Sequence, residues 1–292
     1  MDGIVPLLKP PGMTSNNAVF DIRKLFGEKR AGHLGTLDPG AAGVLPVCLG
    51  RAAQLFDLLV DKEKTYRFVC LFGKATDTQD SYGTVTAERD MHVTADALEA
   101  VLPRFTGSIQ QKAPAYSALK SNGQKLYDLA LAGKEIPEKI RSIFIRSLKV
   151  IEQRGENAFL MEVTCSRGTY VRTLCHDIGI SLGGYAHMGL LIRTAAGPFS
   201  IDRCVTMEEL HEKALCGSLK EVLIEPEQAL LSFPAVTLPG DRLKPMLNGL
   251  SSYIGKKLSS PVRLYCGDTF MGMAEESNGQ LKLKIHLYPI EH

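Results

Sequence analysis

An alternation of side chains along residues 159–165 limits the fold more than any other feature of the sequence. The apolar residues of this segment are Phe159, Met161, Val163 and Cys165, and they alternate with Leu160, Glu162 and Thr164. A period of two is typical of a strand that buries one face, and residues 65–73 form a second β-rich run. Strands and helices do not alternate with a fixed period elsewhere. We therefore predict an α+β fold with a mixed, mostly antiparallel sheet.

Helices are indicated where apolar residues recur at a helical period. We predict helices over residues 16–26, capped by Ser15, and over residues 51–60. A third helix, with an apolar stripe from Val171 to Leu182, follows the strand of residues 159–165 after a short turn. The segment 206–209 (Thr-Met-Glu-Glu) fits a capping box at the start of a further helix.

The length of 292 residues allows one large or two modest domains. Prolines and a glycine interrupt any helical period around residues 231–243, and strand-like runs follow at residues 262–265 and 281–288. We predict a large domain of residues 1–232 and a small β-rich module of residues 233–292. The module is near the lower size limit for independent stability, so it is expected to pack on the larger domain.

The sequence favours a soluble cytoplasmic protein without a metal site. It contains no run of about 18 to 20 apolar residues and no signal-peptide pattern at its start. Its seven cysteines are an odd number without any CxxC pair, which indicates reduced thiols. The histidines show no HxxxH or HExxH spacing, so no metal is expected. Nothing indicates an obligate dimer, and we expect a monomer.

Charge is distributed unevenly along the chain. The formal net charge is only +2, but residues 104–149 hold nine Lys and Arg against three acids, a local +6. Residues 206–232 hold six Glu against two Lys, a local −4. Phosphate binding depends on local cations rather than on the sum, so residues 104–149 are a candidate nucleic-acid surface. A solvated helical face is the alternative.

A glycine-rich and proline-rich segment, residues 31–46, contains a single His and a single Asp. Pro39 holds the preceding Asp38 in an extended conformation, so its carboxylate is presented from a stiff loop. The glycines of the segment allow a backbone or a ligand to approach closely. An Asx-turn, in which Asp38 only closes a bend, is the alternative.

Six segments together resemble one enzyme family. In chain order they are residues 9–15 (KPPGMTS), 31–46 (AGHLGTLDPGAAGVLP), 64–67 (KTYR), 73–80 (GKATDTQD), 116–120 (YSALK) and 165–172 (CSRGTYVR). This order resembles the TruB family, the bacterial tRNA pseudouridine-55 synthases, from Lys9 to about Arg193. The resemblance implies a catalytic domain of pseudouridine-synthase type over residues 1–232. Residues 233–292 are similar to PUA-type RNA-binding modules in position and strand content.

The resemblance implies that the protein isomerises one uridine to pseudouridine in the T-loop of tRNA, at position 55. The target base must leave its stack and enter a pocket. Asp38 then matches the catalytic Asp of the family, and Tyr66 matches the tyrosine that stacks on the base. Arg172 would pair with Asp38, keep it ionised and orient it. An isomerisation needs no redox partner or group donor, so no cofactor is expected.

The remaining matches concern RNA binding. Tyr170 and Leu191 would line the uracil pocket, His33 would hold the T-loop RNA, and Lys9 would pack against the site. Lys120 and other lysines of residues 104–149 would hold phosphates without reading sequence. The chain departs from the commoner family wording with Thr-Leu before Asp38 and Gly40 after Pro39.

Each matched residue also fits an ordinary structural role. Taken singly, Tyr66 and Leu191 fit a core, Arg172 fits a solvent-facing helix position, and His33 fits a loop. A non-catalytic RNA-binding protein or tRNA-folding chaperone is the main alternative function, and it predicts that Asp38→Asn is harmless. A glycoside-type hydrolase needs a second carboxylate in a comparable setting, and the sequence shows none. Whether Asp38 attacks the sugar, attacks the base or assists glycal formation stays open.

Overall fold

A large, mostly antiparallel sheet dominates the computed structural model, which describes residues 1–116, 120–121, 124–125, 132, 137–259 and 261–288. In spatial order its strands are β1 (Gly3–Lys9), β3 (Ala42–Leu49), β12 (Ala186–Ala196), β4 (Lys64–Phe72), β11 (Ala158–Cys165), β10 (Ile140–Gln153) and β7 (Gly107–Lys112). β2 (Ala31–His33) pairs with β3, and β13 (Phe199–Ser200) pairs with β12. Only the β3–β12 pairing is parallel among these strands. The predicted α+β class is confirmed.

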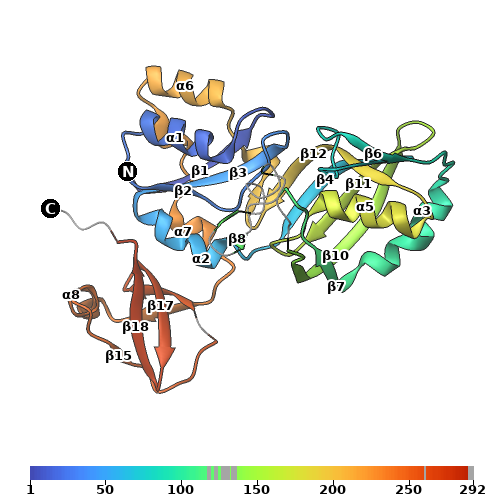
Figure 1. Ribbon diagram of the computed structural model, residues 1–292. Coiled ribbons are helices and arrows are strands. Elements are labelled where there is room, and N and C mark those ends of the chain that lie inside the picture. The colour runs from blue at the N-terminus through green and yellow to red at the C-terminus, as the bar shows by residue number, and fades with distance from the viewer. Residues whose placement is uncertain (117–119, 122–123, 126–131, 133–136, 260, 289–292) are drawn as a thin grey trace.

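Helices cover both halves of this sheet (Figure 1). The half around β4 and β11 carries α5 (Val171–Ser181) and α3 (Ala95–Val101), and the half around β1 and β3 carries α1 (Ser15–Leu25) and α6 (Met207–Leu215). The short helices are η1 (Gly50–Leu55), α2 (Phe56–Leu59), η2 (Leu102–Phe105), η3 (Ile201–Arg203), η4 (Leu219–Val222) and α7 (Pro226–Ala229). Two small ribbons pair β5 (Lys74–Thr76) with β6 (Val85–Glu88) and β8 (Lys120–Ser121) with β9 (Gln124–Lys125).

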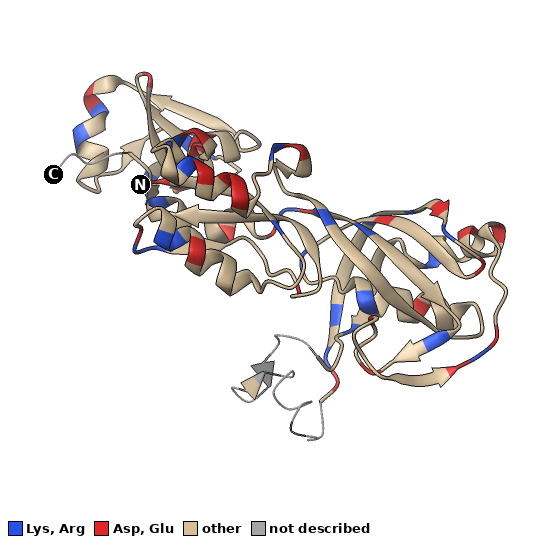
Figure 2. Ribbon diagram, turned by 90° about the horizontal axis from the view of Figure 1, so that it is seen from above, with Lys and Arg blue, Asp and Glu red and all other residues tan. Residues whose placement is uncertain are grey.

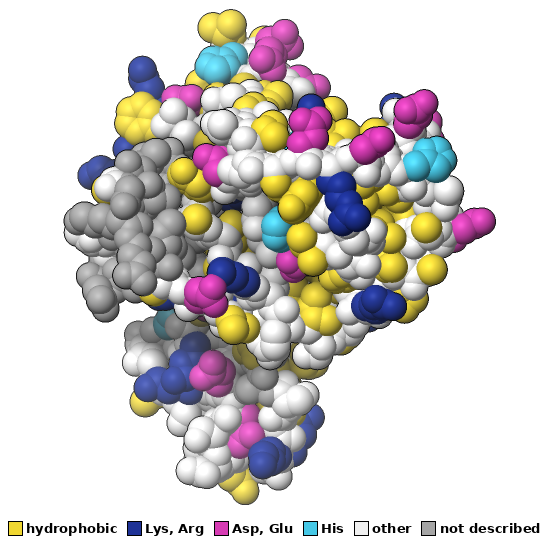
Figure 3. Space-filling model, turned by 45° about the vertical axis from the view of Figure 1, so that its right-hand side comes forward, with side chains coloured by type: hydrophobic (Ala, Val, Ile, Leu, Met, Phe, Trp, Pro, Cys, Tyr) yellow, Lys and Arg dark blue, Asp and Glu magenta, His cyan; other side chains and the backbone are white. Residues whose placement is uncertain are grey.

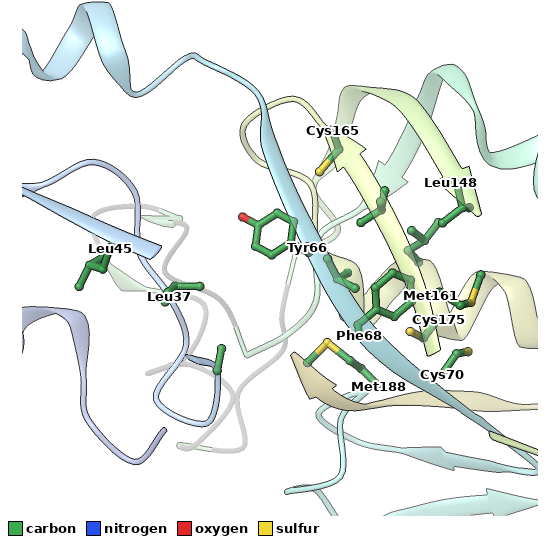
Figure 4. Packing of buried hydrophobic residues seen from close by; sticks show 14 of the residues in the cluster. Leu37, Leu45, Tyr66, Phe68, Cys70, Leu148, Met161, Cys165, Cys175 and Met188 are labelled. Atoms are coloured by element: carbon green, nitrogen blue, oxygen red, sulfur yellow. The ribbon is translucent and has the colours of Figure 1, made fainter. Parts of the chain in front are cut away.

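The main core lies between the sheet and its helices. The alternation predicted at residues 159–165 is present in β11, whose residues alternate between buried and half-buried from Ala158 to Cys165. Its buried side chains join those of β4 and α5, including Phe68, Met161 and Cys175 (Figure 4). Burying one side chain of this kind is worth about 1.5–3 kcal/mol, which explains why the pattern decides the pairing.

A second sheet forms the end of the chain. Its strand order is β14 (Ala235–Leu238), β16 (Val262–Cys266), β17 (Thr269–Ser277), β18 (Gln280–His286) and β15 (Ser252–Tyr253), with η5 (Gly240–Arg242) and α8 (Leu243–Leu247) beside it. Met273 and Leu287 from this part share a buried cluster with Ile4, Val44 and Leu55 of the large part. The predicted packing of the β-rich segment on the larger one is therefore present.

Three local predictions were inaccurate. The cap of α1 is Thr14, whose hydroxyl accepts from the Asn17 amide at 3.1 Å, because Ser15 is used for a tertiary contact. The predicted helix over residues 51–60 is a 3-10 helix followed by one turn of α-helix. The glycine-rich segment is a loop only between β2 and β3, since both ends pair within the sheet. In addition, the segment 231–243 contains the strand β14, which was not predicted and which pairs with β16.

All seven cysteines are free, in agreement with the expected reduced thiols. No helix within the described ranges is both long and apolar enough to span a membrane.

Candidate active site

Asp38 stands on the short loop between β2 and β3. The loop is fixed from behind: the Ser15 hydroxyl donates to the Leu37 carbonyl and accepts from the Leu37 amide, both at 2.9 Å. The Ala41 amide donates to the Asp38 carbonyl at 3.0 Å, which closes the turn through the backbone. The Asp38 side chain is 49% exposed and is not needed for the turn. A stiff loop therefore presents an accessible carboxylate.

Arg172 holds that carboxylate. Its Nη2 lies 3.2 Å from Asp38 Oδ2 and donates to the Tyr116 carbonyl at 3.0 Å, and its Nη1 donates to the Thr78 carbonyl at 3.0 Å. The Arg172 side chain is only 7% exposed, so it does not point to solvent as a lone helix residue would. A planar guanidinium with several fixed partners orients a carboxylate better than a flexible ammonium does.

Asp80 is a second carboxylate of the site, and the sequence motifs gave it no role of its own. Its Oδ2 lies 3.6 Å from Arg172 Nη1, and its side chain is 13% exposed. Its Oδ1 accepts from the Thr78 hydroxyl at 2.7 Å and from the Tyr82 amide at 3.0 Å. Asp80 therefore neutralises the buried guanidinium and leaves the Asp38 carboxylate exposed. Its place in the segment 73–80 was the only available signal.

Tyr66 lies on β4, and its ring is buried on the side of the strand that faces Leu37 (Figure 4). Its backbone is in register with Arg193 of β12, and the Arg193 charge lies close enough to act on its phenol. Burial raises the pKa of the Tyr66 phenol above its ordinary value, and the nearby Arg193 charge opposes part of that rise. The phenol is therefore neutral near pH 7.

Arg193 is the largest fully buried side chain of the described residues, and no role was predicted for it. It donates from Nε to the Val44 carbonyl at 2.7 Å, from Nη2 to the Gly35 carbonyl at 3.0 Å and from Nη1 to the Thr36 carbonyl at 3.4 Å. It thereby supports the backbone of the Asp38 loop from the sheet side. Gly43 allows β3 to approach β12 closely enough for these contacts. Its φ is +114°, and an added Cβ would lie 2.2 Å from the Arg193 carbonyl oxygen.

Lys9 is also fully buried. Its ammonium donates to the carbonyls of Met13 at 2.7 Å, Pro10 at 2.8 Å and Pro39 at 3.3 Å, so it ties β1 to the Asp38 loop. Burial lowers the pKa of Lys9 to about 8, while the Asp38 charge acts in the opposite direction. Lys9 therefore positions the loop through carbonyls and contributes a nearby positive charge.

His33 has an unused ring nitrogen. Its Nδ1 is buried and has no hydrogen-bond partner within the part of the chain that the structure describes. Burial lowers the pKa of His33, and the Arg193 charge lowers it further. A neutral imidazole with an unsatisfied polar atom is costly to bury, which marks His33 as a candidate functional residue.

The structure shows local contacts for two other predicted residues, Leu191 and Tyr170, and places Lys120 in a short strand. Leu191 is half-buried on β12 opposite Phe68 and packs on the main core. Tyr170 caps α5, and its backbone makes two hydrogen bonds with the Gln111 side chain, at 2.8 and 3.0 Å. The backbone of Lys120 lies in β8, but its side chain is outside the described residues. The structure therefore brings together Asp38, Arg172, Tyr66, Lys9 and His33.

Among the described residues, no group of three or more His, Cys, Asp or Glu side chains is arranged to hold a metal ion. The chemistry available from these side chains is that of one accessible carboxylate beside a neutral phenol and several buried cations.

Comparison with known proteins identifies the family. Residues 23–171 match the TruB family pseudouridylate synthase N-terminal domain, and residues 172–231 match the tRNA pseudouridylate synthase B C-terminal domain. The chain belongs to the TruB family. The family predicted from the sequence motifs is therefore confirmed, and with it the assignment to an isomerase class of enzyme.

Similar TruB-family proteins cover nearly the whole chain. A tRNA pseudouridine synthase B of Pelotomaculum thermopropionicum is 46% identical over 91% of this chain and 86% of its own length. One from Azoarcus sp. is 44% identical over 97% of this chain and 94% of its own length.

Solved structures agree with the fold. A Cbf5-Nop10-Gar1 complex contains a chain with a TM-score of 0.73 and 27% identity, covering 94% of this chain and 78% of that one. An H/ACA RNP bound to a substrate RNA containing 2'-deoxyuridine contains a chain with a TM-score of 0.76, covering 98% of this chain and 85% of that one. At 23% identity, this match supports the fold of the chain and carries no statement about its function.

Proposed function

We propose that this protein converts uridine to pseudouridine at position 55 in the T-loop of tRNA. The relatives over most of the chain are named tRNA pseudouridine synthase B, which supports tRNA as the substrate. The observation that carries the proposal is the placement of Asp38: an accessible carboxylate held by the buried Arg172 on a loop supported by Lys9 and Arg193. An accessible carboxylate of this kind can reach a base that has been flipped out of an RNA loop.

The reaction breaks the bond between N1 of uracil and C1' of the ribose, turns the uracil, and joins C5 to C1'. The proton leaves C5, N1 gains one, and no electrons are exchanged with a cofactor. The Asp38 carboxylate supplies the negative charge near the ribose and base in all three routes: attack on the sugar, attack on the base and glycal formation. Tyr66 packs on the uracil as a neutral phenol, and Tyr170 and Leu191 complete the pocket.

Binding of the RNA uses the surrounding residues. His33, which is half-buried at the end of β2, is proposed to bind the T-loop close to the flipped base. Lys120 and the neighbouring cations hold phosphates, and recognition depends on the shape of the loop. Extruding the base costs a few kcal/mol, and stacking returns about 1–3 kcal/mol per base.

The second sheet belongs to the proposed RNA-binding module, a PUA-like unit of residues 233–292. Its surface has a hollow of about 540 Å³ lined by Tyr253, Lys256 and Lys257 together with Glu276 and Asn278. An exposed aromatic beside two cations is suited to a single-stranded RNA end. We place the activity in the cytoplasm, where all seven thiols stay reduced, and attribute it to a monomer.

Mapping the modified position tests the proposed function. The protein is incubated with a tRNA transcript carrying tritium at C5 of its uridines, and the product is mapped for pseudouridine. We expect one equivalent of tritium release and pseudouridine at position 55. A transcript with cytidine at position 55 serves as the control and is expected to release none. Binding of the transcript without any release would favour the RNA chaperone instead, and release from another uridine would refute position 55.

A further inference from the structure

Tyr82 is a large aromatic side chain beside the Asp38 loop that the fold leaves uncovered. It is 72% exposed, yet the outer end of its ring lies against Gly40, two residues after Asp38. A Cβ added at Gly40 would lie 2.3 Å from Cε2, 2.6 Å from Cζ and 2.8 Å from the hydroxyl oxygen of Tyr82. The ring tip therefore occupies the space that a side chain at position 40 would need.

Position 40 needs a glycine because of the contact with Tyr82, and not because of its backbone conformation. Its φ is outside the left-handed region, whereas Gly35 and Gly43 of the same segment have φ values of +102° and +114°. Any residue can adopt the Gly40 backbone, and a glycine there has an entropic cost. The glycine at position 40 thus leaves room for the Tyr82 ring.

The backbone of Tyr82 is fixed to the site. Its amide donates to Asp80 Oδ1 at 3.0 Å, and the same carboxylate contacts Arg172. The preceding Ser81 amide donates to the Met188 carbonyl at 2.9 Å. The Asp80 turn thus fixes the backbone of Tyr82, and the outer end of its ring lies against Gly40. Most of the ring surface stays exposed.

We propose that Tyr82 is a stacking platform for an unpaired base of the RNA substrate next to the uridine on which Asp38 acts. The proposal rests on the proposed function. Extruding a uridine removes a stacking partner from its neighbour, and an exposed ring at the edge of the site replaces that partner. Tyr66 is assigned to the target uracil, and its ring is otherwise buried, so it does not serve the neighbour. Stacking tolerates any base, so Tyr82 adds affinity rather than sequence preference.

Steady-state kinetics on a T-arm transcript separates stacking from catalysis. We expect Tyr82→Ala to raise KM by about ten-fold, within the range that loss of one stacked base produces, and to leave kcat within about two-fold. Tyr82→Phe keeps the ring and is expected to behave as the wild type. A Tyr82→Ala variant that lowers kcat at unchanged KM would show a positioning role toward Asp38 and overturn the proposal.

Gly40→Ala provides a double-mutant test. The added methyl displaces the ring, so Gly40→Ala is expected to raise KM in the wild type and to have no further effect in the Tyr82→Ala background. An equal effect in both backgrounds would mean that Gly40 acts on the Asp38 loop alone, contrary to the proposal.

Fluorescence reports stacking directly, because the chain contains no tryptophan. Tyr82→Trp gives a single-tryptophan protein whose emission is expected to be quenched, with saturation, by a T-arm transcript. Leu215→Trp, at an 89% exposed position at the end of α6, is the matched control and is expected to stay bright.

The outcomes distinguish the two proposals. An active wild type whose Tyr82→Trp variant is quenched no more than Leu215→Trp would refute the stacking role alone. A wild type that forms no pseudouridine while Tyr82→Trp is still quenched would refute the proposed function and leave Tyr82 as an RNA contact.

Discussion

The cations of the candidate site and those of strand β10 carry the same charge in entirely different surroundings. Arg193 and Lys9 are fully buried, and the Arg172 side chain is 7% exposed. On β10, the side chains of Arg146 and Lys149 are 64% and 59% exposed, and each pairs with one glutamate. The buried cations bind several backbone carbonyls each, whereas the exposed ones have solvent as an alternative partner.

The difference shows why charge counted along the sequence does not locate the buried cations of the site. The segment 104–149 has a local charge of +6, but Arg146 pairs with Glu63 and Lys149 with Glu162, both acids from outside the segment. Figure 2 shows basic and acidic residues interspersed along the ribbon, and Figure 3 shows their side chains interspersed on one face of the molecule. Burial and the number of fixed partners distinguish the site cations instead.

Replacing Arg172 should have the largest effect. Arg172→Met removes the partner of Asp38 and leaves the mostly buried Asp80 without its cation. We expect a loss of about 3 kcal/mol in the free energy of unfolding and at least about 100-fold in pseudouridine formation. Urea unfolding and tritium release measure the two. Arg172→Lys keeps the charge but not the planar donor set, so its activity should be intermediate; wild-type activity of either variant would contradict the role of Arg172.

Replacing Arg193 should have the next largest effect. Arg193→Met leaves the carbonyls of Gly35, Thr36 and Val44 without this donor, which we expect to cost about 2–3 kcal/mol in stability. Activity should fall by about ten-fold, because the Asp38 loop loses its support while Asp38 keeps Arg172. The same two assays apply. Unchanged stability of the variant would mean that the desolvation cost of the buried Arg193 charge equals the stabilisation that its hydrogen bonds provide.

Lys9 should produce a smaller, pH-dependent effect. Its pKa is about 8 in the folded protein and near 10.5 when unfolded, so above pH 8 the unfolded chain binds more protons and stability rises with pH. Burial also lowers the pKa of Lys64 to about 8, so Lys64 likewise makes stability rise with pH. Between pH 8 and 9 the change of the urea midpoint with pH should be less positive in Lys9→Met than in the wild type; the thiols titrate in both proteins, so their contribution cancels in the comparison. An identical rise would show that Lys9 does not titrate in this window.

The exposed pair should matter least. Arg146 Nε lies 2.7 and 2.8 Å from the two Glu63 oxygens, but both side chains are solvated. We expect Arg146→Ala to change the free energy of unfolding by less than about 1 kcal/mol, with an even smaller change at high salt. A loss as large as that of Arg193→Met would remove the distinction between the two regions.

The sequence predicted the fold where local period decides it. The alternation in β11 and the capping box of α6, with Thr206 and Glu209, were predicted correctly because short-range packing and hydrogen bonds produce both. The cap of α1 was misassigned by one residue, since Thr14 and Ser15 are both capping types and only the tertiary contact of Ser15 with Leu37 separates them. β14 was missed because prolines flank it and its pairing with β16 is distant in sequence.

The site was predictable in part for a similar reason. Motifs located Asp38, Tyr66 and Arg172, and the ion pair expected between Arg172 and Asp38 is present. Arg193 was not recognised as a site residue, since an arginine in a strand is ordinarily exposed and its burial depends on β12 meeting Gly43 of β3. The Gly40–Tyr82 contact was equally invisible, because the two positions lie in separate loops.

The comparison of Asp38→Asn with the wild type tests the central claim most directly. Asparagine keeps the shape and the neutral hydrogen-bonding capacity of the side chain but removes its negative charge. One experiment measures tritium release from a T-arm transcript under single-turnover conditions, with binding of the same transcript as the internal control. We predict that Asp38→Asn binds the transcript within about three-fold of the wild type and releases no tritium above background, as expected when an essential charged group is lost. Undiminished release by Asp38→Asn would contradict the assignment of the chemistry to this carboxylate.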